Sequence, residues 1–238
     1  MKKILVLASK AEDYIYKNSA KTPLKKEGGP AFFIKKTFDA LDVEYKLAKS
    51  TSAKVEIKII NKEEMGRIAK EDKIKIPKKI KESSILISTI GPNSFNLNFL
   101  NNYKGNVFLD IQGFVRQKKS NKFGAKRFCD EITGIIDKID ILKCNSKEFK
   151  FLPEKVIEKA KEKILIETKG AKGVRLWKEG SRLDFKPKKI IKTENAIGAG
   201  DTFMAAFVYK LINTKDIEKS ILFALDYASS YLAEINRT

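Results

Sequence analysis

Short apolar runs alternate along the chain with longer segments in which apolar residues recur every three or four positions. The short runs are typical of buried strands, and they fall at residues 4–8, 84–88, 107–110, 139–143 and 164–168. Helical spacing indicates helices at residues 31–41, 95–102, 127–137, 153–163, 200–212 and 215–234. This alternation predicts a mostly parallel sheet with helices on both faces, and such sheets bind ligands at the carboxyl ends of their strands.

A second pattern, the strict alternation of polar and apolar residues, occupies residues 54–60. It indicates a half-exposed strand, with which residues 67–70 can pair. Residues 50–75 are therefore expected to form a small β flap outside the core. The whole chain, 1–238, is expected to be one domain with this flap attached, and residues 14–25 are a further candidate part of the flap.

The composition narrows the chemistry that this α/β protein can perform. The chain has 238 residues, 42% of them hydrophobic, but no apolar run near the roughly 20 residues of a membrane span. It has no histidine, so proton transfer falls to Asp, Glu, Lys, Tyr or Cys. Cys129 and Cys144 have neither metal-site nor disulfide spacing, and we expect buried thiols in a reducing cytoplasm.

The formal net charge of +19 raises the question of a nucleic-acid partner, because Lys and Arg neutralise phosphates. The lysines are spread along the whole chain and interleaved with glutamates, as in residues 154–163. Such mixed charge is typical of a solvated helix face. We therefore expect no nucleic-acid partner and no membrane, while the excess charge would still attract anionic nucleotides.

The segment Gly198-Ala199-Gly200-Asp201 carries the clearest chemistry, because it stands directly before a long apolar helix. A helix start has backbone N–H groups without partners and a partial positive charge, which together favour an anion. Glycines let the backbone approach a phosphate closely. An acid beside such a site points to phosphoryl transfer to an alcohol, and helix capping by Asp201 is the structural alternative.

Polar residues also follow four of the predicted strands and should share one rim of the sheet. They are Asp13, the segment 110–116, Asn145 with Glu148, and the turn at 168–173. Each has a structural alternative. Asp13 can be a solvated loop acid, Asn145 and Glu148 can form a capping box, and Gly170 and Gly173 can be hairpin residues.

Taken in order, these segments resemble the signatures of the ribokinase-like (PfkB) family of small-molecule kinases. Gly28-Gly29-Pro30-Ala31 is similar to the N-terminal double-glycine motif, and residues 198–203 are similar to the C-terminal signature. Residues 145–148 match the Asn-x-x-Glu motif, and residues 168–173 match the Thr-x-Gly-x-x-Gly turn. The resemblance covers nearly the whole chain. It implies a three-layer α/β/α sandwich with a mostly parallel central sheet and a small β lid.

The resemblance also implies an ATP- and Mg²⁺-dependent kinase with assigned residues. Asp201 would be the catalytic base, and the backbone of Gly198, Ala199 and Gly200 would hold the γ-phosphate. The nucleotide would lie beside Asn145, Thr168, Gly170 and Gly173, and Mg²⁺ would be organised by Asn145 and, through water, by Glu148. The acceptor would face Asp13, Gly28, Gly29, Gln112 and Asp201, with the flap as its lid.

The position of Asp201 leads to one physical expectation. A helix N-terminus favours a charged carboxylate, so the pKa of Asp201 should be low and the residue a weak base. A weak base suffices if phosphoryl transfer is loose, because positioning and charge stabilisation then do most of the catalysis.

Two departures from the family pattern bear on ligands. Asn195 and Ala196 stand where relatives carry Asp-Thr, which puts activation by a monovalent cation in question. Phe32 and Phe33 stand near a position where relatives have Asn.

Segment 110–116 resembles archaeal members and plant myo-inositol kinases, so a sugar or cyclic polyol is the expected acceptor. One alternative is a nucleoside, whose base could stack on Phe32, Phe33 or Phe114 if those rings are not simply core. Another is a catalytically weak nucleotide- or sugar-binding regulator. An exposed lid strand would offer an open edge for a homodimer.

Overall fold

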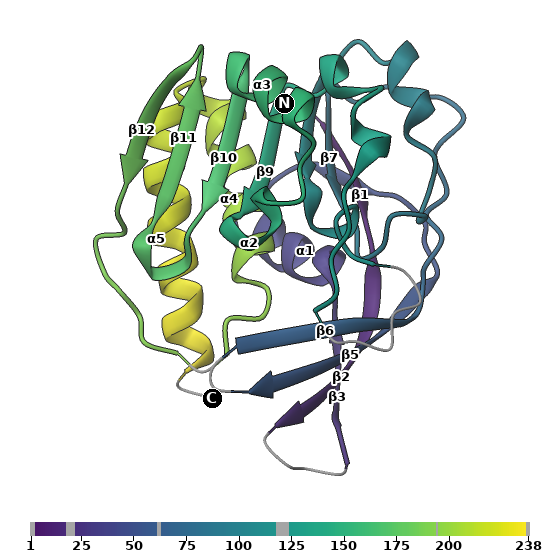
Figure 1. Cartoon of the computed structure of the whole chain (residues 1–238), viewed down its shortest axis with the longest axis vertical. Helices are drawn as coiled ribbons and strands as arrows, with labels where there is room; N and C mark the ends of the chain where they lie inside the picture. Colours follow the sequence, from purple (N-terminus) through teal and green to yellow (C-terminus); the bar gives the residue numbers. More distant parts are fainter. Residues whose placement is uncertain (1–2, 18–21, 61–62, 118–123, 194, 237–238) are drawn as a thin grey trace.

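The structure, a computed structural model, describes residues 3–17, 22–60, 63–117, 124–193 and 195–236. An eight-stranded sheet forms its centre (Figure 1). The strands, in order across the sheet, are β12 (Ser181–Phe185), β11 (Val174–Lys178), β10 (Ile164–Thr168), β9 (Ile141–Asn145), β8 (Asn106–Asp110), β7 (Ser84–Ser88), β1 (Ile4–Ala8) and β4 (Tyr45–Leu47). The strands from β10 to β4 run parallel, and β11 runs antiparallel to both β10 and β12.

Both faces of this sheet are buried over its inner strands, because successive residues of these strands enter different cores. In β1, Leu5 and Leu7 join one core, whereas Ile4 and Val6 join the other. Helices α1 (Pro30–Ala40), α4 (Ala199–Thr214) and α5 (Ile217–Ile235) pack on the second face. The first face is covered by α2 (Ser146–Phe149), α3 (Glu154–Glu162) and the short 3₁₀ turns η1 (Leu97–Asn102), η2 (Ile111–Gly113), η3 (Asp130–Ile132) and η4 (Ile136–Lys138). The predicted three-layer α/β/α sandwich with a mostly parallel sheet is confirmed.

Helix α4 is the central helix of its layer. Eight consecutive residues, 201–208, are buried, so this helix has no solvent-facing stripe over its first half. A helix that is apolar all round belongs in the interior of an α/β protein. Its first turn is thereby held rigidly against the sheet.

The sequence pattern was wrong about the type of two predicted helices. Residues 127–137 form the two 3₁₀ turns η3 and η4 instead of an α-helix, although Ile132, Ile135 and Ile136 are buried as the pattern requires. Gly134 and the β-branched residues around it disfavour a continuous helix. In the helix predicted at 95–102, Leu97–Asn102 form the 3₁₀ turn η1.

A second, four-stranded sheet lies beyond the carboxyl ends of the central strands (Figure 1). Its order is β3 (Leu24–Gly28), β2 (Lys10–Lys17), β5 (Ser52–Ile60) and β6 (Glu63–Lys70). Its core contains Ala11, Ile15, Ala53, Val55 and Ile57, with Ile90 from the central domain. The strands expected at 54–60 and 67–70 lie in this sheet, but the pattern did not predict β2 and β3. Residues 18–21 and 61–62, which belong to the predicted flap segments, lie outside the described residues.

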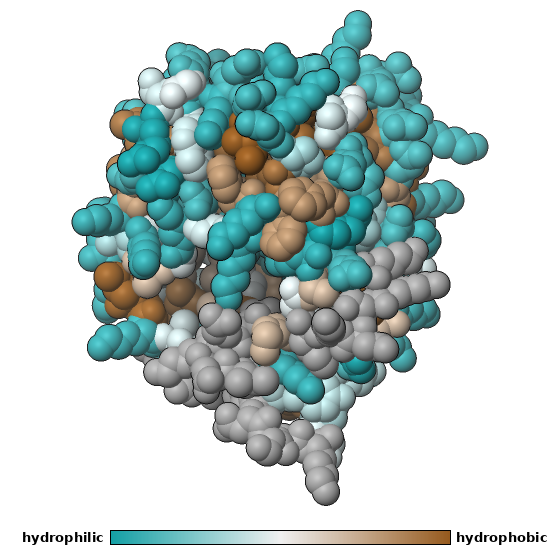
Figure 2. Space-filling view, viewed as in Figure 1, coloured by the Kyte–Doolittle hydropathy of each residue, from teal (hydrophilic) through white to brown (hydrophobic). Residues whose placement is uncertain are grey.

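The surface carries the excess positive charge. In the upper part of the face seen in Figure 2, hydrophilic side chains predominate, with apolar side chains between them. No helix in the described part of the chain is both long and apolar enough to span a bilayer.

Candidate active site

A cavity of about 1050 Å³ opens where the central strands end and the second sheet begins. It brings together six of the predicted catalytic and ligand-binding residues: Asp13, Thr168, Gly170, Gly173, Ala199 and Gly200. Asp201 is the next residue of α4 and is only 8% exposed. Motifs that are up to 188 positions apart in the sequence therefore meet at one site.

Residues 198–201, the proposed anion-binding turn, form the start of α4. Gly198 is the N-cap and has a left-handed backbone, with φ of 82°. A Cβ atom there would lie 2.2 Å from Cδ1 of Phe33, so only glycine fits. The amide of Ala199 donates to the carbonyl of Ala196 at 3.1 Å, whereas those of Gly200 and Asp201 donate to no acceptor within the described residues. The two free N–H groups lie at the N-terminus of α4, where the helix dipole also attracts negative charge.

The carboxylate of Asp201 is held by one of its two oxygens. Oδ1 accepts hydrogen bonds from Nε2 of Gln112 at 2.8 Å and from Oγ of Ser88 at 3.1 Å. Gln112 also donates to Ser88 at 2.9 Å, which closes a triangle. No group in the described ranges donates a hydrogen bond to Oδ2. The second oxygen is therefore available to a ligand.

The electrostatics of Asp201 contradict the expectation of a low pKa. Burial raises the pKa of this carboxyl above its ordinary value, against the opposing effects of Lys143, Ser88, Gln112 and Arg116. The helix terminus was expected to dominate, but removal from water penalises the charged form more strongly. Asp201 is therefore a stronger base than a solvated aspartate.

A buried ion pair that the sequence analysis did not single out lies beside this turn. Nζ of Lys143 is 2.6 Å from Oδ2 of Asp110, and both side chains are almost completely buried. The pattern ended the strand at residue 143, but β9 continues to Asn145 and buries Lys143 within it. A lysine inside an otherwise apolar run was the available signal, because a buried charge needs a partner.

Asn145 and Glu148 form the capping box that was the structural alternative. Oδ1 of Asn145 accepts from the amides of Lys147 and Glu148, both at 2.9 Å, and Oε2 of Glu148 accepts from the amide of Asn145. No cluster of three or more His, Cys, Asp or Glu suited to a metal exists among the described residues. Mg²⁺ usually keeps several waters and binds through one or two carboxylates and substrate phosphates. Glu148 fits that mode through Oε1, which lies 3.9 Å from Nζ of Lys126.

The turn after β10 needs its glycines for different reasons. Gly173 has φ of 94°, and a Cβ atom there would lie 1.9 Å from the carbonyl oxygen of Phe185, so hairpin packing requires glycine. Gly170 has φ of 58° but open space around it, and it borders the cavity. The hydroxyl of Thr168 donates to the carbonyl of Cys144 at the end of the neighbouring strand.

Asp13 lines the cavity, and Gly28 of the double glycine packs against it. Asp13 is not in a loop but in β2, where it is 5% exposed. A Cβ atom on Gly28 would lie 1.8 Å from Oδ2 of Asp13, and Gly29, with φ of 78°, is the N-cap of α1. The first glycine thus makes room for the carboxylate, and the second turns the chain into the helix.

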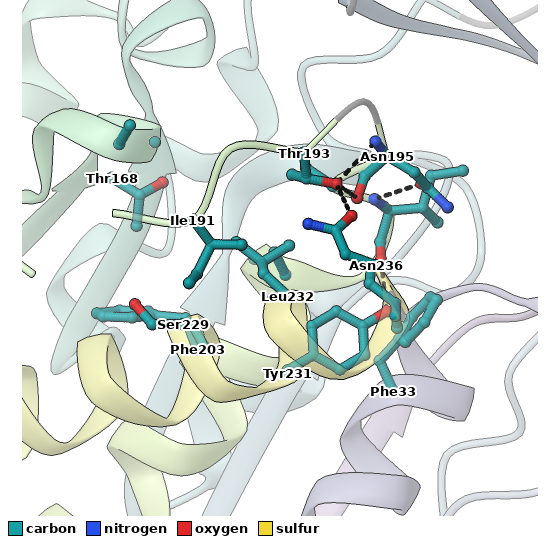
Figure 3. A pocket seen from close by; sticks show the side chains of 18 of the residues that line it. Phe33, Thr168, Ile191, Thr193, Asn195, Phe203, Ser229, Tyr231, Leu232 and Asn236 are labelled. Carbon is teal, nitrogen blue, oxygen red and sulfur yellow. Dashed lines mark hydrogen bonds between the residues drawn. The ribbon is translucent and has the colours of Figure 1, made fainter. Parts of the chain in front are cut away.

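Hydrogen bonds organise the segment that leads into the anion-binding turn (Figure 3). Thr193 donates to Oδ1 of Asn236 at 2.7 Å and accepts from the amide of Asn195 at 3.0 Å. Oδ1 of Asn195 accepts from the amide of Ile197 at 3.1 Å, and the hydroxyl of Tyr231 donates to the Ile197 carbonyl at 2.6 Å. Hydrogen bonds between neutral side chains and the backbone thus hold the segment around Asn195, where relatives carry Asp-Thr.

The three aromatic residues considered for stacking have different environments. Phe114 is 2% exposed and belongs to the core, and Phe33 packs edge-on against Tyr231 beneath the turn (Figure 3). Phe32 is half-buried and lines the cavity. Phe33 also lines the cavity but is only 8% exposed, so Phe32 offers the larger surface to a ligand.

This architecture is the ribokinase fold. A pyrophosphate-dependent kinase in the ribokinase family, solved with a pyrophosphate analogue and myo-inositol, aligns with a TM-score of 0.73 and 18% identity over 98% of this chain and 95% of that one. The Burkholderia thailandensis nucleoside kinase in complex with inosine gives 0.76 and 14%, over 97% and 89%. The Arabidopsis thaliana ribokinase with ribose and ATP gives 0.65 and 17%, over 96% and 91%. At these identities the likeness establishes the fold.

The family is established by the sequence itself. Residues 112–235, more than half of the chain, match the model of the pfkB family carbohydrate kinases. The chain belongs to this family. A comparison with curated proteins gives no match.

Proposed function

We propose that the protein is an ATP-dependent kinase that transfers the γ-phosphate to a hydroxyl group of a sugar or cyclic polyol. The observation that carries this proposal is the arrangement at the start of α4. Oδ1 of Asp201 is fixed by Ser88 and Gln112. Among the residues that the structure describes, nothing donates to Oδ2 and nothing accepts from the amides of Gly200 and Asp201. Membership of a carbohydrate kinase family supports the same reaction class.

In this mechanism Asp201 orients the acceptor and takes its proton. The acceptor hydroxyl donates a hydrogen bond to Oδ2, and its oxygen attacks the terminal phosphorus of the donor. As the bond from phosphorus to the leaving oxygen breaks, the hydroxyl proton passes to Oδ2. The free amides at the start of α4 stabilise the negative charge on the phosphoryl oxygens. A raised pKa makes Asp201 better suited to accept the proton.

The donor would occupy the less polar half of the cavity. Its lining there includes Val174, Ile190, Phe203, Leu225 and Leu232, which suit a nucleobase. Gly170 borders the same region without a side chain in the way.

When bound, Mg²⁺ would neutralise phosphate charge, and Glu148 is the carboxylate that would hold its waters. The neutral network around Asn195 supports a turn that needs no monovalent cation.

The acceptor would occupy the half of the cavity beneath the second sheet, which we propose acts as a lid on the single domain. Asp13 offers a buried carboxylate there, and carboxylates recognise hydroxyl-rich rings through hydrogen bonds. Phe32, at the same cavity, supports the second candidate, a nucleoside acceptor whose base stacks on the ring.

A panel of acceptors and donors tests the proposal. Sugars, inositols and nucleosides are each incubated with ATP, ADP or pyrophosphate, and phosphorylated products are identified by mass spectrometry. We expect ATP-dependent product with a sugar or polyol, and none from Asp201→Asn protein purified in parallel. Product with nucleosides alone would favour the second candidate. Absence of acceptor-dependent product in every combination would overturn the kinase assignment and leave a binding regulator.

A further inference from the structure

The buried pair formed by Lys143 and Asp110 has no role in the mechanism described so far. The two side chains are 5% and 0% exposed, with 2.6 Å between Nζ and Oδ2. Removing two charges from water is costly, and apolar residues of similar volume often stabilise a core as well as such a pair does. A buried pair that adds little stability invites a search for another role.

The surroundings of the pair point toward the reacting groups. A Cβ atom on Gly200 would lie 3.1 Å from Nζ of Lys143, so the ammonium lies directly under the turn that has the free amides. Asp110 is also the N-cap of η2 and accepts a hydrogen bond from the amide of Gln112, whose side chain holds Asp201. One residue of the pair thus underlies the anion-binding turn, and the other positions a partner of the base.

Among the described residues, Lys143 from β9 and Arg116 from the segment after η2 act on the Asp201 carboxylate with positive charge. Asp110 from β8 interacts with Asp201 as a second carboxylate, whereas Glu148 from α2 acts on Lys143 and Asp110. Nζ of Lys143 lies 2.6 Å from the Asp110 carboxylate inside the protein, so the ammonium has a buried counter-charge beside it. Lys143 therefore provides a permanent positive charge that solvent does not screen.

We propose that Lys143, held in place by Asp110, is a positioning residue that keeps Asp201 ionised and supports the anion-binding turn from beneath. This inference rests on the proposed function, in which Asp201 is the base. Lys143 would not touch the substrate. Its positive charge would offset the cost that burial places on the charged form of Asp201. Asp110 would bind the ammonium, so that Lys143 does not form a direct ion pair with Oδ2 of Asp201.

Opposite shifts in the pH profile test the proposal. In Lys143→Met, Asp201 loses a nearby positive charge, so the acid limb of kcat should move up by about one pH unit or more. In Asp110→Asn, a negative charge is removed, so the limb should move down. Activity of Lys143→Met should recover toward wild type at pH values well above the limb. Lys178→Met, which alters an exposed lysine of β11, is the matched control and should leave the profile unchanged.

A second measurement does not depend on turnover. The ¹³C carboxyl resonance of Asp201, assigned by its absence in Asp201→Asn, is titrated in each folded variant. The pKa should rise in Lys143→Met, fall in Asp110→Asn and change less in the double variant, which leaves no unpaired buried charge. Shifts in the same direction in both single variants, or an unmoved Asp201 titration, would overturn the inference. Full activity of Asp201→Asn would instead overturn the proposed function, whatever the titration gave.

Discussion

At the scale of single residues, Asp201 is defined by which of its atoms are already engaged. Ser88 and Gln112 both donate to Oδ1, so the side chain cannot rotate without losing two hydrogen bonds in a buried site. Its burial raises its pKa, as the motif alone did not indicate. The residue is thus preorganised and basic before any ligand binds.

Replacing Asp201 by Asn should separate catalysis from folding. The Asn oxygen can still accept from Ser88 and Gln112, so the melting temperature should stay close to that of the wild type. The lost base should lower kcat by roughly 10²–10⁴-fold, the usual effect of removing a general base. Product formation and thermal melting of the same preparation measure both quantities. A kcat within a few-fold of wild type would contradict the role of Asp201.

The raised pKa of Asp201 also predicts the pH dependence of the wild-type enzyme. The active form is the carboxylate, so kcat should fall as the pH drops through the folded-state pKa. That pKa lies above the ordinary 3.8, so the loss begins at a higher pH than for a solvated aspartate. Steady-state rates at saturating substrates give the limb, with circular dichroism at each pH to confirm folding. An acid limb of kcat with a midpoint at or below pH 3.8 would contradict a raised pKa of Asp201.

At the scale of elements, the chemistry depends on one helix start and on what packs against it. Helix α4 begins at a left-handed glycine whose missing side chain leaves room for Phe33 of α1. Tyr231 of α5 holds the preceding carbonyl, at Ile197. Two neighbouring helices therefore determine where the free amides of α4 point.

Gly198→Ala should therefore destabilise the protein more than Gly170→Ala. Both glycines have positive φ, so both variants incur backbone strain of about 1–3 kcal/mol. Only at residue 198 would the new methyl group also overlap Phe33, whereas Gly170 has open space. Urea denaturation of the two variants provides the comparison. Equal losses in the free energy of unfolding would mean that the Phe33 contact is not a constraint.

At the scale of the whole molecule, the second sheet packs against the residue that precedes the proposed anion-binding turn. Ile197, directly before Gly198, packs against the same apolar cluster as Val55 and Ile90. The proposed lid and the anion-binding turn are therefore in contact through side chains. A lid in this place would exclude water, which otherwise competes with the acceptor for the phosphoryl group.

Weakening this cluster should reduce the selectivity for the acceptor over water. In Val55→Ser, a 4% exposed side chain of β5 becomes polar, so the sheet should close less tightly. We expect the rate of ATP hydrolysis without acceptor to rise relative to transfer. Lys54→Ser, on the exposed face of the same strand, is the control and should keep the wild-type ratio. An unchanged ratio in Val55→Ser would argue against a role of the sheet in excluding water.

Local residue patterns were sufficient to predict most of the strands and helices and to locate the motifs. Parallel strands buried on both faces read as apolar runs, and Gly198, Gly170 and Gly28 mark turns because glycine tolerates positive φ or close approach. The same patterns could not distinguish an α-helix at 127–137 from 3₁₀ turns, because both bury the same isoleucines. They also missed β2 and β3, because apolar and polar residues do not alternate regularly along these two strands.

The sequence by itself determined the layer architecture, the family and the anion-binding helix start, because these depend on periodicity and on residue types at short spacing. The tertiary structure alone decided the hydrogen bonding, charge pairing and pKa of the residues in the candidate site. The pairing of Lys143 with Asp110, the hold of Ser88 and Gln112 on Asp201 and the raised pKa all arise from contacts between strands far apart in sequence. Burial and long-range charge are properties of the folded interior, so no local pattern can specify them.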